Sequence, residues 1–319
     1  MAIPYLGDNL PYAAMGAGRR TELGTLLPPG GRVAAYVRSS GLQSQDDQRM
    51  APMLVTTLNA GLARCRSGLG DVVCVLPGHT ENISAADQMS SLVASTRIIG
   101  LGTGTDRPTF TWSAATSTFL FDVANTVLVN CILNFAGDRA STTALTVAAP
   151  ITISAAGCSL IGNEINFGVD GDQLATIGLT TTAAADNLTL IGNHCWGATT
   201  SEVTTFFQII GADRLVMVDN VFEGATSAVG VGIVRFATTA SLNIRLERNT
   251  YINRKAASTA AVTGLSTVSG TSRDEHFAYL DNASLTPWIT STGLMVFHRP
   301  TVTNTAGETG TEVVGVVSA

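Results

Sequence analysis

The sequence is poor in charged residues and has almost no lysine. Charged residues make up 13% of the 319 residues, against about 25% in ordinary soluble domains, and Lys255 is the only lysine. The formal net charge is −6, whereas a nucleic-acid binder needs a basic face, so we expect no nucleic-acid partner. So few ionic groups cannot cover a free monomer. We therefore expect a surface of Thr, Ser, Asn and Gly that is partly buried against other subunits.

Long hydrophobic runs, a leader peptide and cysteine pairs are also missing. A membrane-spanning helix needs about 20 consecutive apolar residues, and runs such as 215–218 and 313–317 have only strand length. Met1–Tyr5 shows no basic segment followed by an apolar one, which predicts synthesis in a cytoplasm without a secretory signal. The five cysteines are scattered and contain no Cys-x-x-Cys pair. We expect free buried thiols and no metal site.

Composition divides the chain into four segments. Residues 1–30 are rich in Pro and Gly without periodicity, which predicts an extended N-terminal arm. Residues 31–70 hold a probable strand and an apolar stripe from Met50 to Cys65 at helical spacing, which predicts a helix that caps an open sheet end. Residues 71–257 contain short β-rich runs, and residues 258–319 predict a C-terminal β-rich cap or subunit-contact region.

Five segments of the third part align on one asparagine. These asparagines are Asn130, Asn163, Asn193, Asn220 and Asn249, which are 33, 30, 27 and 29 residues apart. Each has an apolar residue three positions before it and an apolar or aromatic residue two positions after it. Four of the five also have an apolar residue five positions before the asparagine, and residues at five and three positions before it share one face of a strand. Asn suits a bend because it tolerates left-handed geometry and bonds backbone groups. Amides stacked at about 4.8 Å can also bond each other, so the pattern predicts a structural asparagine ladder.

A second apolar run precedes most of these asparagine segments. Two or three short strands per coil of about 30 residues predict an all-β fold, a right-handed parallel β-helix or solenoid. A β-sandwich would need hairpin turns at intervals of roughly 8–12 residues. Asp170-Gly171 is the only Asn-Gly or Asp-Gly pair in the chain, which favours the solenoid.

Several motifs invite a catalytic or binding interpretation. His79 and Glu81 follow an apolar strand and could belong to an active site, but the same pattern closes the first coil of a β-helix. The glycines at 100–104 lack the spacing of a phosphate loop, and a turn explains them better. Asp170 and Asp172 lack the remaining ligands of an EF-hand loop. We predict no metal-binding and no cofactor-binding residues.

Glycan-cleaving β-helices need two carboxylates about 5–10 Å apart in a groove. Glu164 and Asp219 do not share a position in the repeat. Asp186 and Asp213 do, seven positions before their asparagines, but they sit where they can cap turns. Because aromatic content is only 6%, a sugar-cleaving groove is not favoured. We predict that the protein is not an enzyme and has no catalytic residues.

Three stretches resemble a family of tailed-bacteriophage virion proteins: Asp71–Ile83, Arg97–Trp112 and Ser154–Cys158. The resemblance runs from about Val37 to the C-terminus. It implies a pectate-lyase-like β-helix without catalytic residues or cofactor, acting as a capsid decoration (cement) protein. The implied protein is a homotrimer on the capsid surface, assembled in the host cytoplasm. Its implied partners are the major capsid protein and copies of itself, with no nucleic acid and no membrane.

Two functions stay open at this point. A decoration protein would stabilise the head by bridging capsomers. A tailspike or fibre adhesin would instead bind or depolymerise host surface polysaccharide. A spike should have a separate N-terminal particle-binding domain, longer insertions and an aromatic groove, and the sequence shows none of these clearly. A free pectate-lyase-like enzyme fits less well, because a secretion signal is missing.

Overall fold

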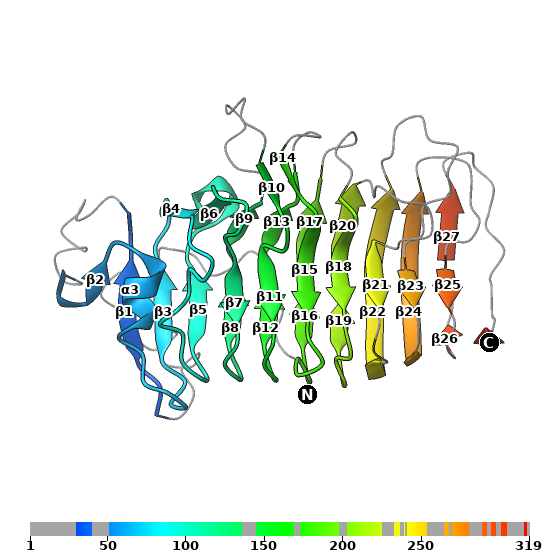
Figure 1. The fold of residues 1–319 in the computed structure, drawn as a ribbon, viewed down its shortest axis with the longest axis horizontal. Coiled ribbons are helices and arrows are strands. Elements are labelled where there is room, and N and C mark those ends of the chain that lie inside the picture. Colours follow the sequence, from blue (N-terminus) through cyan, green and yellow to red (C-terminus); the bar gives the residue numbers. More distant parts are fainter. Residues whose placement is uncertain are drawn as a thin grey trace.

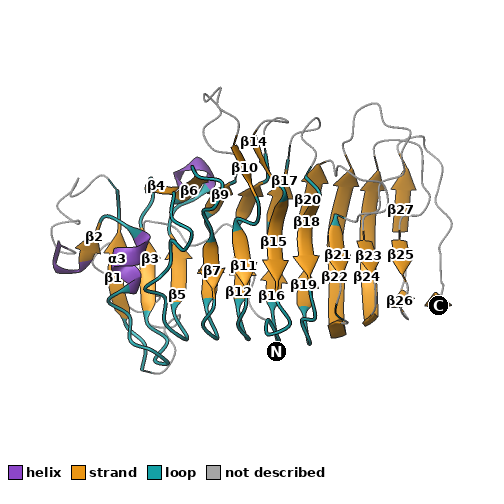
Figure 2. Cartoon of the chain, viewed as in Figure 1, coloured by secondary structure: helices purple, strands orange, loops and turns teal. Residues whose placement is uncertain are grey.

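The computed structural model describes residues 30–39, 51–135, 145–168, 173–197, 203–224, 233–236, 239 and 241–253, and six strands between residues 265 and 317. Most of these residues form short strands that pair in parallel and wind into a β-solenoid (Figure 1). Within these described ranges, helix occurs only as short pieces (Figure 2). The predicted all-β solenoid is confirmed. The predicted arm lies outside the described residues, except for Gly30.

The strands of successive coils form three stacks, of which the third begins only at β7. The first stack contains β1 (Val33–Val37), β3 (Val72–Val75), β5 (Arg97–Gly100), β8 (Val127–Val129), β12 (Ser159–Ile161), β16 (Thr189–Ile191), β19 (Val216–Val218), and parts of β22 (Ser241–Asn253) and β24 (Gly270–Leu280), then β26 (Met295–Phe297). The second contains β4 (Thr80–Ile83), β6 (Thr109–Trp112), β9 (Ile132–Asn134), β13 (Glu164–Asn166), β17 (His194–Trp196), β20 (Val221–Gly224), the remainder of β22 and β24, and β27 (Thr301–Asn304). The third contains β7 (Phe119–Phe121), β11 (Ile151–Ile153), β15 (Ile177–Thr181), β18 (Thr205–Ile209), β21 (Val234–Phe236), β23 (Leu265–Thr267) and β25 (Ile289–Ser291).

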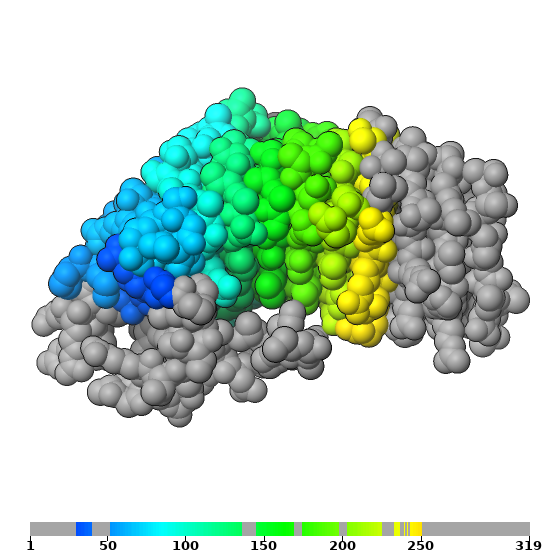
Figure 3. Space-filling model, turned by 90° about the horizontal axis from the view of Figure 1, so that it is seen from below, coloured from blue at the N-terminus to red at the C-terminus, as the bar shows by residue number. Residues whose placement is uncertain are grey.

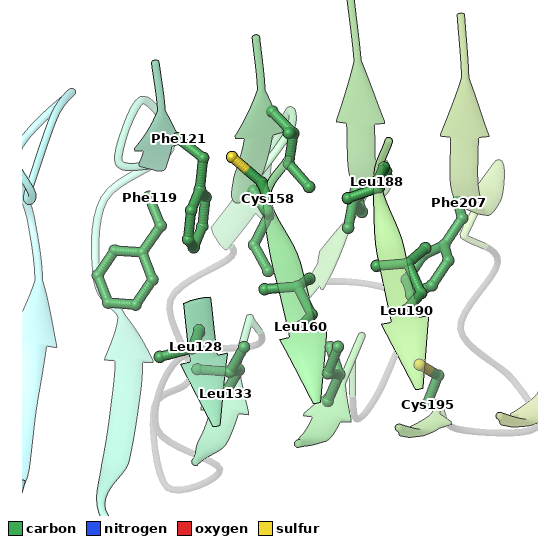
Figure 4. Packing of buried hydrophobic residues seen from close by; sticks show 14 of the residues in the cluster. Phe119, Phe121, Leu128, Leu133, Cys158, Leu160, Leu188, Leu190, Cys195 and Phe207 are labelled. Atoms are coloured by element: carbon green, nitrogen blue, oxygen red, sulfur yellow. The ribbon is translucent and has the colours of Figure 1, made fainter. Parts of the chain in front are cut away.

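The register aligns equivalent residues of successive coils. In the first stack, Leu160 pairs with Leu128 in the coil before and with Leu190 in the coil after. All three side chains are fully buried and point into one interior (Figure 4). Because strands in a sheet are about 4.8 Å apart, each column repeats at that spacing. Sequence order therefore follows the long axis of the molecule (Figure 3).

Aromatic rings form a continuous part of this core. Trp112 lies edge-on to Phe119 and Phe135, with ring centroids 4.9 and 4.7 Å apart. Phe135 meets Phe167 at 5.5 Å, and Phe167 stacks on Phe206 at 4.3 Å. Aromatic pairs of this kind contribute about 0.5–1.5 kcal/mol each beyond the area they bury. These aromatic side chains therefore lie inside the solenoid and not on its surface.

The N-terminal end differs from the predicted helix over 50–65. Within the described residues, that stretch forms η2 (Ala51–Met53), β2 (Leu54–Val55) and a short helix, α3 (Leu58–Leu62). β2 pairs in parallel with β1. The β-branched run 55–57 favours extended backbone, and Thr57 begins the helix as its N-cap, because its hydroxyl accepts from the Ala60 N–H at 3.3 Å. The apolar residues at helical spacing therefore do contain a helix, but it is limited to Leu58–Leu62.

α3 nevertheless packs against the open end, as a cap should. Leu58 and Leu62 are fully buried in the main core. A Cβ at Gly61 would lie 3.0 Å from Val37 Cγ2 and from Val73 Cγ1. Glycine at this position therefore lets the helix lie close to β1 and β3.

The solenoid extends beyond both predicted boundaries, 71 and 257. β1 pairs in parallel with β3, so the first stack begins at Val33. β24, β25 and β27 continue the stacks after residue 257, and β28 (Val316–Val317) pairs antiparallel with β26. The asparagine repeat cannot be recognised in the sequence after residue 257, because the residue in register with Asn249 in the next coil is His276. β10 (Leu145–Val147) and β14 (Gln173–Ala175) form a separate two-stranded sheet.

Candidate functional site

Four of the five ladder asparagines stack at the corner between the first and second stacks. The Nδ2 of Asn163 donates to Oδ1 of Asn193 at 3.1 Å. Asn193 donates in the same way to Asn220, and Asn220 to Asn249, both at 2.9 Å. Each of these side chains is at most 1% exposed. The amides therefore form one buried hydrogen-bonded chain along the solenoid axis.

Every amide in this chain also bonds the backbone. Oδ1 of Asn193 accepts from the backbone N–H of Asn163 at 3.1 Å, and Nδ2 of Asn193 donates to the carbonyl of Leu160 at 2.9 Å. Asn163 and Asn220 make the equivalent donations to Leu128 and Leu190. Buried backbone groups at a corner cannot reach water, so the ladder satisfies donors and acceptors that the strand pairing leaves free.

Asn130 is not a member of the ladder, and this part of the prediction is wrong. The backbone N–H of Cys131 donates to Oδ1 of Asn163 at 3.0 Å, so Cys131 occupies the ladder position of its coil. Asn130 lies one residue earlier, with φ of 57°. Its Nδ2 donates to the carbonyls of Gly100 and Gly102 at 2.9 and 3.1 Å. Asn130 and Asn163 are 33 residues apart in the sequence, whereas the equivalent positions of the two coils, Cys131 and Asn163, are one residue closer.

Left-handed residues bracket each of the first-stack strands β8, β12, β16, β19 and the start of β22. Those just before the ladder position are Asn130, Gly162, Gly192, Asp219 and Arg248, with φ between 50° and 63°. Those at the other end of the strand are Asn125, Gly157, Asn187, Arg214 and Asn243, with φ between 55° and 74°. The two sets are five residues apart in every coil. The left-handed geometry that we assigned to the ladder asparagines belongs instead to the residue before each of them.

His79 and Glu81 form a buried contact that fastens the cap to the first coils. His79 Nε2 lies 3.1 Å from Glu81 Oε2, and His79 is fully buried. The same carboxylate oxygen accepts from the Leu58 N–H at 2.7 Å, and Oε1 accepts from Gln88 Nε2 at 3.3 Å. Glu81 thereby satisfies a free N–H of α3. Nδ1 of His79 has no hydrogen-bond partner among the described residues.

Asp71 ties the chain before β3 to the start of β1. Its fully buried carboxylate accepts from Nε and Nη2 of Arg66 at 3.0 and 2.7 Å, and from the backbone N–H groups of Arg66 and Arg32. Hydrogen bonding to the Arg66 side chain holds the pKa of Asp71 at about 2, despite the opposing effect of burial.

The other carboxylates singled out in the sequence serve turns or surface pairs. Oδ1 of Asp186 accepts from the backbone N–H of Asp213 one coil later, at 2.9 Å. Asp219 accepts a two-pronged pair from Arg248 at 2.6 and 2.8 Å. The pair Asp170 and Asp172 lies outside the described residues. Of the glycines at 100–104, Gly100 packs against Asn130, since a Cβ at Gly100 would lie 2.4 Å from the Asn130 carbonyl oxygen, whereas a Cβ at Gly104 would meet open space.

One polar cluster escaped the sequence analysis. It lies on the outward side of the second stack, where Glu164 pairs in register with His194, and Trp196 with Glu223. Glu164 accepts from Arg107 and, at 3.2 Å, from the Trp196 indole N–H. His194 Nε2 lies 3.6 Å from Glu223 Oε2. The cluster could have been found from the ladder, because its members stand one or three residues after Asn163, Asn193 and Asn220.

The cysteines are free, as their number and scatter predicted. Cys74, Cys131, Cys158 and Cys195 are buried, and Cys65 is partly buried. Burial raises the pKa of Cys74 and of Cys131 to about 12, and that of Cys65 to about 11. Burial also raises the pKa of Cys158 and that of Cys195. The thiols therefore stay protonated and inert.

Two further features are missing from the described part of the chain. No three His, Cys, Asp or Glu side chains in these ranges gather into a group that could hold a metal ion. Likewise, none of the helices in the described ranges has the length and apolar character needed to span a bilayer.

Comparison with known proteins adds one distant neighbour. No protein-family model matches the chain, and neither does any curated protein. Among solved structures, the chain is similar to a protein described as "Geobacillus virus E2 - ORF18", with 11% sequence identity over 84% of this chain and a TM-score of 0.24. The chain spans 60% of that protein's length. This score is too low to indicate a shared fold.

Proposed function

We propose that this chain is a structural subunit of a tailed-phage virion, namely a decoration protein that stabilises the head by bridging neighbouring capsid subunits. The observation that carries the proposal is the buried asparagine ladder of Asn163, Asn193, Asn220 and Asn249. It joins the corners of successive coils, and we infer that the solenoid is therefore a stiff rod. A rod of this kind supports a mechanical role. The family resemblance of Asp71–Ile83 and Arg97–Trp112 points to the same class of protein.

The outward side of the first stack supports contact with other proteins. Val129, Ile161, Ile191 and Val218 follow one another in register on that side. Ile161 and Ile191 remain partly exposed. An aliphatic column on a chain with so few charges suits packing against the capsid protein and against further copies, as in a homotrimer. Nucleic acid and membranes are not among the proposed partners.

The roles of the buried titratable groups support a protein without catalysis. Glu81 satisfies the start of α3, Asp71 holds two arginine backbone groups, and Asp186 satisfies a turn. Each of these three carboxylates thus has a structural partner that a reaction would have to displace. The proposed function therefore needs no cofactor and no metal.

A phage that lacks the protein tests the proposal. An amber mutation in its gene, grown in a non-suppressing host, should yield filled heads that release DNA at a lower temperature than wild-type heads. Adding the purified full-length protein should restore the wild-type release temperature. Heads of unchanged stability on particles that fail to adsorb to the host would contradict the decoration role and favour an adhesin.

A further inference from the structure

The outward faces of the first and second stacks differ in chemistry. The first-stack face carries the aliphatic column of Ile161 and Ile191. On the second stack, Leu133, Ile165, Cys195 and Phe222 point into the core, so the residues between them point outward. We call this outward side of β4, β6, β9, β13, β17 and β20 the polar face. The contrast means that the two faces suit different partners.

Side-chain amides and hydroxyls line much of the polar face. One column runs in register through Asn82, Thr111, Asn134 and Asn166 and continues as Trp196 and Glu223. Its members repeat at about 4.8 Å, the strand spacing. The neighbouring column contains Ile132 and Val221, but places Glu164 and His194 between them. Asn166 is buried, and its Oδ1 accepts from the Gly168 N–H at 3.1 Å, whereas the other members of this column are at least partly exposed.

Trp196 occupies the centre of the charged part of this face. Glu164 stands one coil before it and Glu223 one coil after it, so the two glutamates lie on opposite sides of the strand that carries Trp196. Glu164 orients the ring by accepting its N–H at 3.2 Å. The side chains of Glu164 and Glu223 are 29% and 23% exposed, and that of His194 is 50% exposed. These groups are held in place but remain within reach of a ligand.

We propose that the polar face binds an uncharged oligosaccharide, made of neutral hexoses or N-acetylhexosamines, around Trp196. An indole offers an apolar surface beside a polar edge, which matches a sugar ring with one apolar side and a rim of hydroxyls. Amide, carboxylate and hydroxyl side chains supply the donors and acceptors that fix orientation in a ligand site. The site goes beyond the scaffold role and does not depend on it.

The charge of the face selects against other ligands. Glu164 and Glu223 flank Trp196, and Arg107, which lies against Glu164 in the described part of the chain, is paired with that carboxylate. Sugars that carry carboxylates or sulfates would be repelled, as would nucleic acid and anionic lipid. A protein partner would bury these half-exposed carboxylates at a cost. Uncharged sugars exchange hydrogen bonds with water instead and avoid that cost.

Calorimetry on the full-length protein tests the site. The probes are hexasaccharides of neutral hexoses, of N-acetylhexosamines and of uronic acids, each titrated into the same protein. We expect binding by at least one of the two uncharged classes and weaker or no binding by the uronic acids. Trp196→Ala and Glu164→Gln should each weaken that binding by about tenfold or more, since buried interface anchors usually cost above 1 kcal/mol when truncated.

A matched control separates the site from the general surface. Glu247 is also a partly exposed glutamate paired with an arginine, Arg245, at 2.6 Å, but it stands on the first stack. Glu247→Gln should leave sugar binding unchanged. Glu223→Gln provides a second test if Trp196→Ala fails to give the wild-type circular dichroism spectrum. The proposal is overturned if no uncharged probe binds at millimolar concentration, if uronic acids bind more tightly, or if Glu247→Gln weakens binding as much as Glu164→Gln.

Discussion

Asn163 and Asn193 stand one coil apart and are joined through a single oxygen. Oδ1 of Asn193 accepts both the side-chain N–H and the backbone N–H of Asn163, each at 3.1 Å. The Nδ2 of Asn193 in turn donates to Oδ1 of Asn220 at 2.9 Å. Buried hydrogen bonds that share atoms in this way act as a unit, so removing one member leaves partners unsatisfied on both sides.

Replacing a central ladder residue should therefore be costly. Asn193→Ala removes the acceptor of two Asn163 donors and the donor to the Leu160 carbonyl. Leaving buried polar groups unpaired costs about 1–3 kcal/mol each, so we expect the free energy of unfolding to fall by about 3 kcal/mol or more. Denaturant unfolding followed by circular dichroism measures it. A loss under about 1 kcal/mol would mean that the ladder contributes little.

Asn130 should behave differently from Asn163 on replacement by glycine. Asn130 has φ of 57°, a conformation that glycine adopts freely, and it loses only two bonds to carbonyls. Asn130→Gly should lower stability by about 1 kcal/mol at most, whereas Asn163→Gly should lower it several times as much. Denaturant unfolding of the two variants measures the difference, provided that the dependence of the unfolding free energy on denaturant concentration is the same in both. Equal losses would place both residues in the same role.

The contrast between these two asparagines shows how far the sequence alone could be interpreted. The repeat of about 30 residues and its buried amides followed from Asn163, Asn193 and Asn220, because each has core-facing neighbours at fixed offsets. In the coil of Asn130 the ladder position is Cys131, and the asparagine one residue earlier misled the alignment. The better clue was Leu128, which falls under Leu160 only after a shift of one residue.

Other features depended on contacts that no local pattern contains. The apolar stripe before residue 65 has helical spacing, yet pairing of β2 with β1 converts its start into a strand. The outward cluster around Trp196 draws its members from different coils of unequal length, so it can be found only after those coils are aligned on Asn163, Asn193 and Asn220. Sequence patterns thus predicted the coil, while three-dimensional pairing determined its ends and its outer faces.

Gly178 should be less tolerant of alanine than Gly162. A Cβ at Gly178 would lie 1.5 Å from Phe167 Cε1, deep in the core. Overpacking of this kind costs about 1–3 kcal/mol or more. Gly162 has open space around its Cα and φ of 62°, so alanine there should cost only about 1–2 kcal/mol.

Combining Gly178→Ala with Phe167→Leu tests the cause of that loss. The smaller side chain removes the ring atoms that meet the new methyl group. The double variant should therefore lose less stability than the sum of the two single variants, as measured in a double-mutant cycle. Additive losses would show that Phe167 is not the obstacle.

Acid should weaken the link between Asp71 and Arg66. The pKa of Asp71 is about 2 in the folded protein, below its usual value of about 3.9. A lowered folded pKa means that this contribution is complete above about pH 4 to 5 and is lost as the pH falls toward 2. Asp71→Asn should be less stable than wild type at pH 7 and should lose less further stability between pH 4 and 2. Thermal unfolding over that range measures the difference, and parallel pH profiles would contradict it.

The cysteines should react only slowly while the protein is folded. Burial raises the pKa of Cys65 to about 11 and that of Cys131 to about 12, so the reactive thiolate is scarce near neutral pH. As the pH rises, Cys65 should be alkylated before Cys131, because it is also the less buried of the two. Mass spectrometry of iodoacetamide-treated protein gives the order. Prompt labelling of Cys131 at pH 7 would contradict the packing of this coil.

The location of the protein on intact particles tests the proposed scaffold role most directly. Cryo-electron microscopy of wild-type virions, compared with particles that lack the protein, should show rod-shaped density over the junctions between capsid subunits, into which the solenoid fits along its long axis. Difference density confined to the tail would contradict the account.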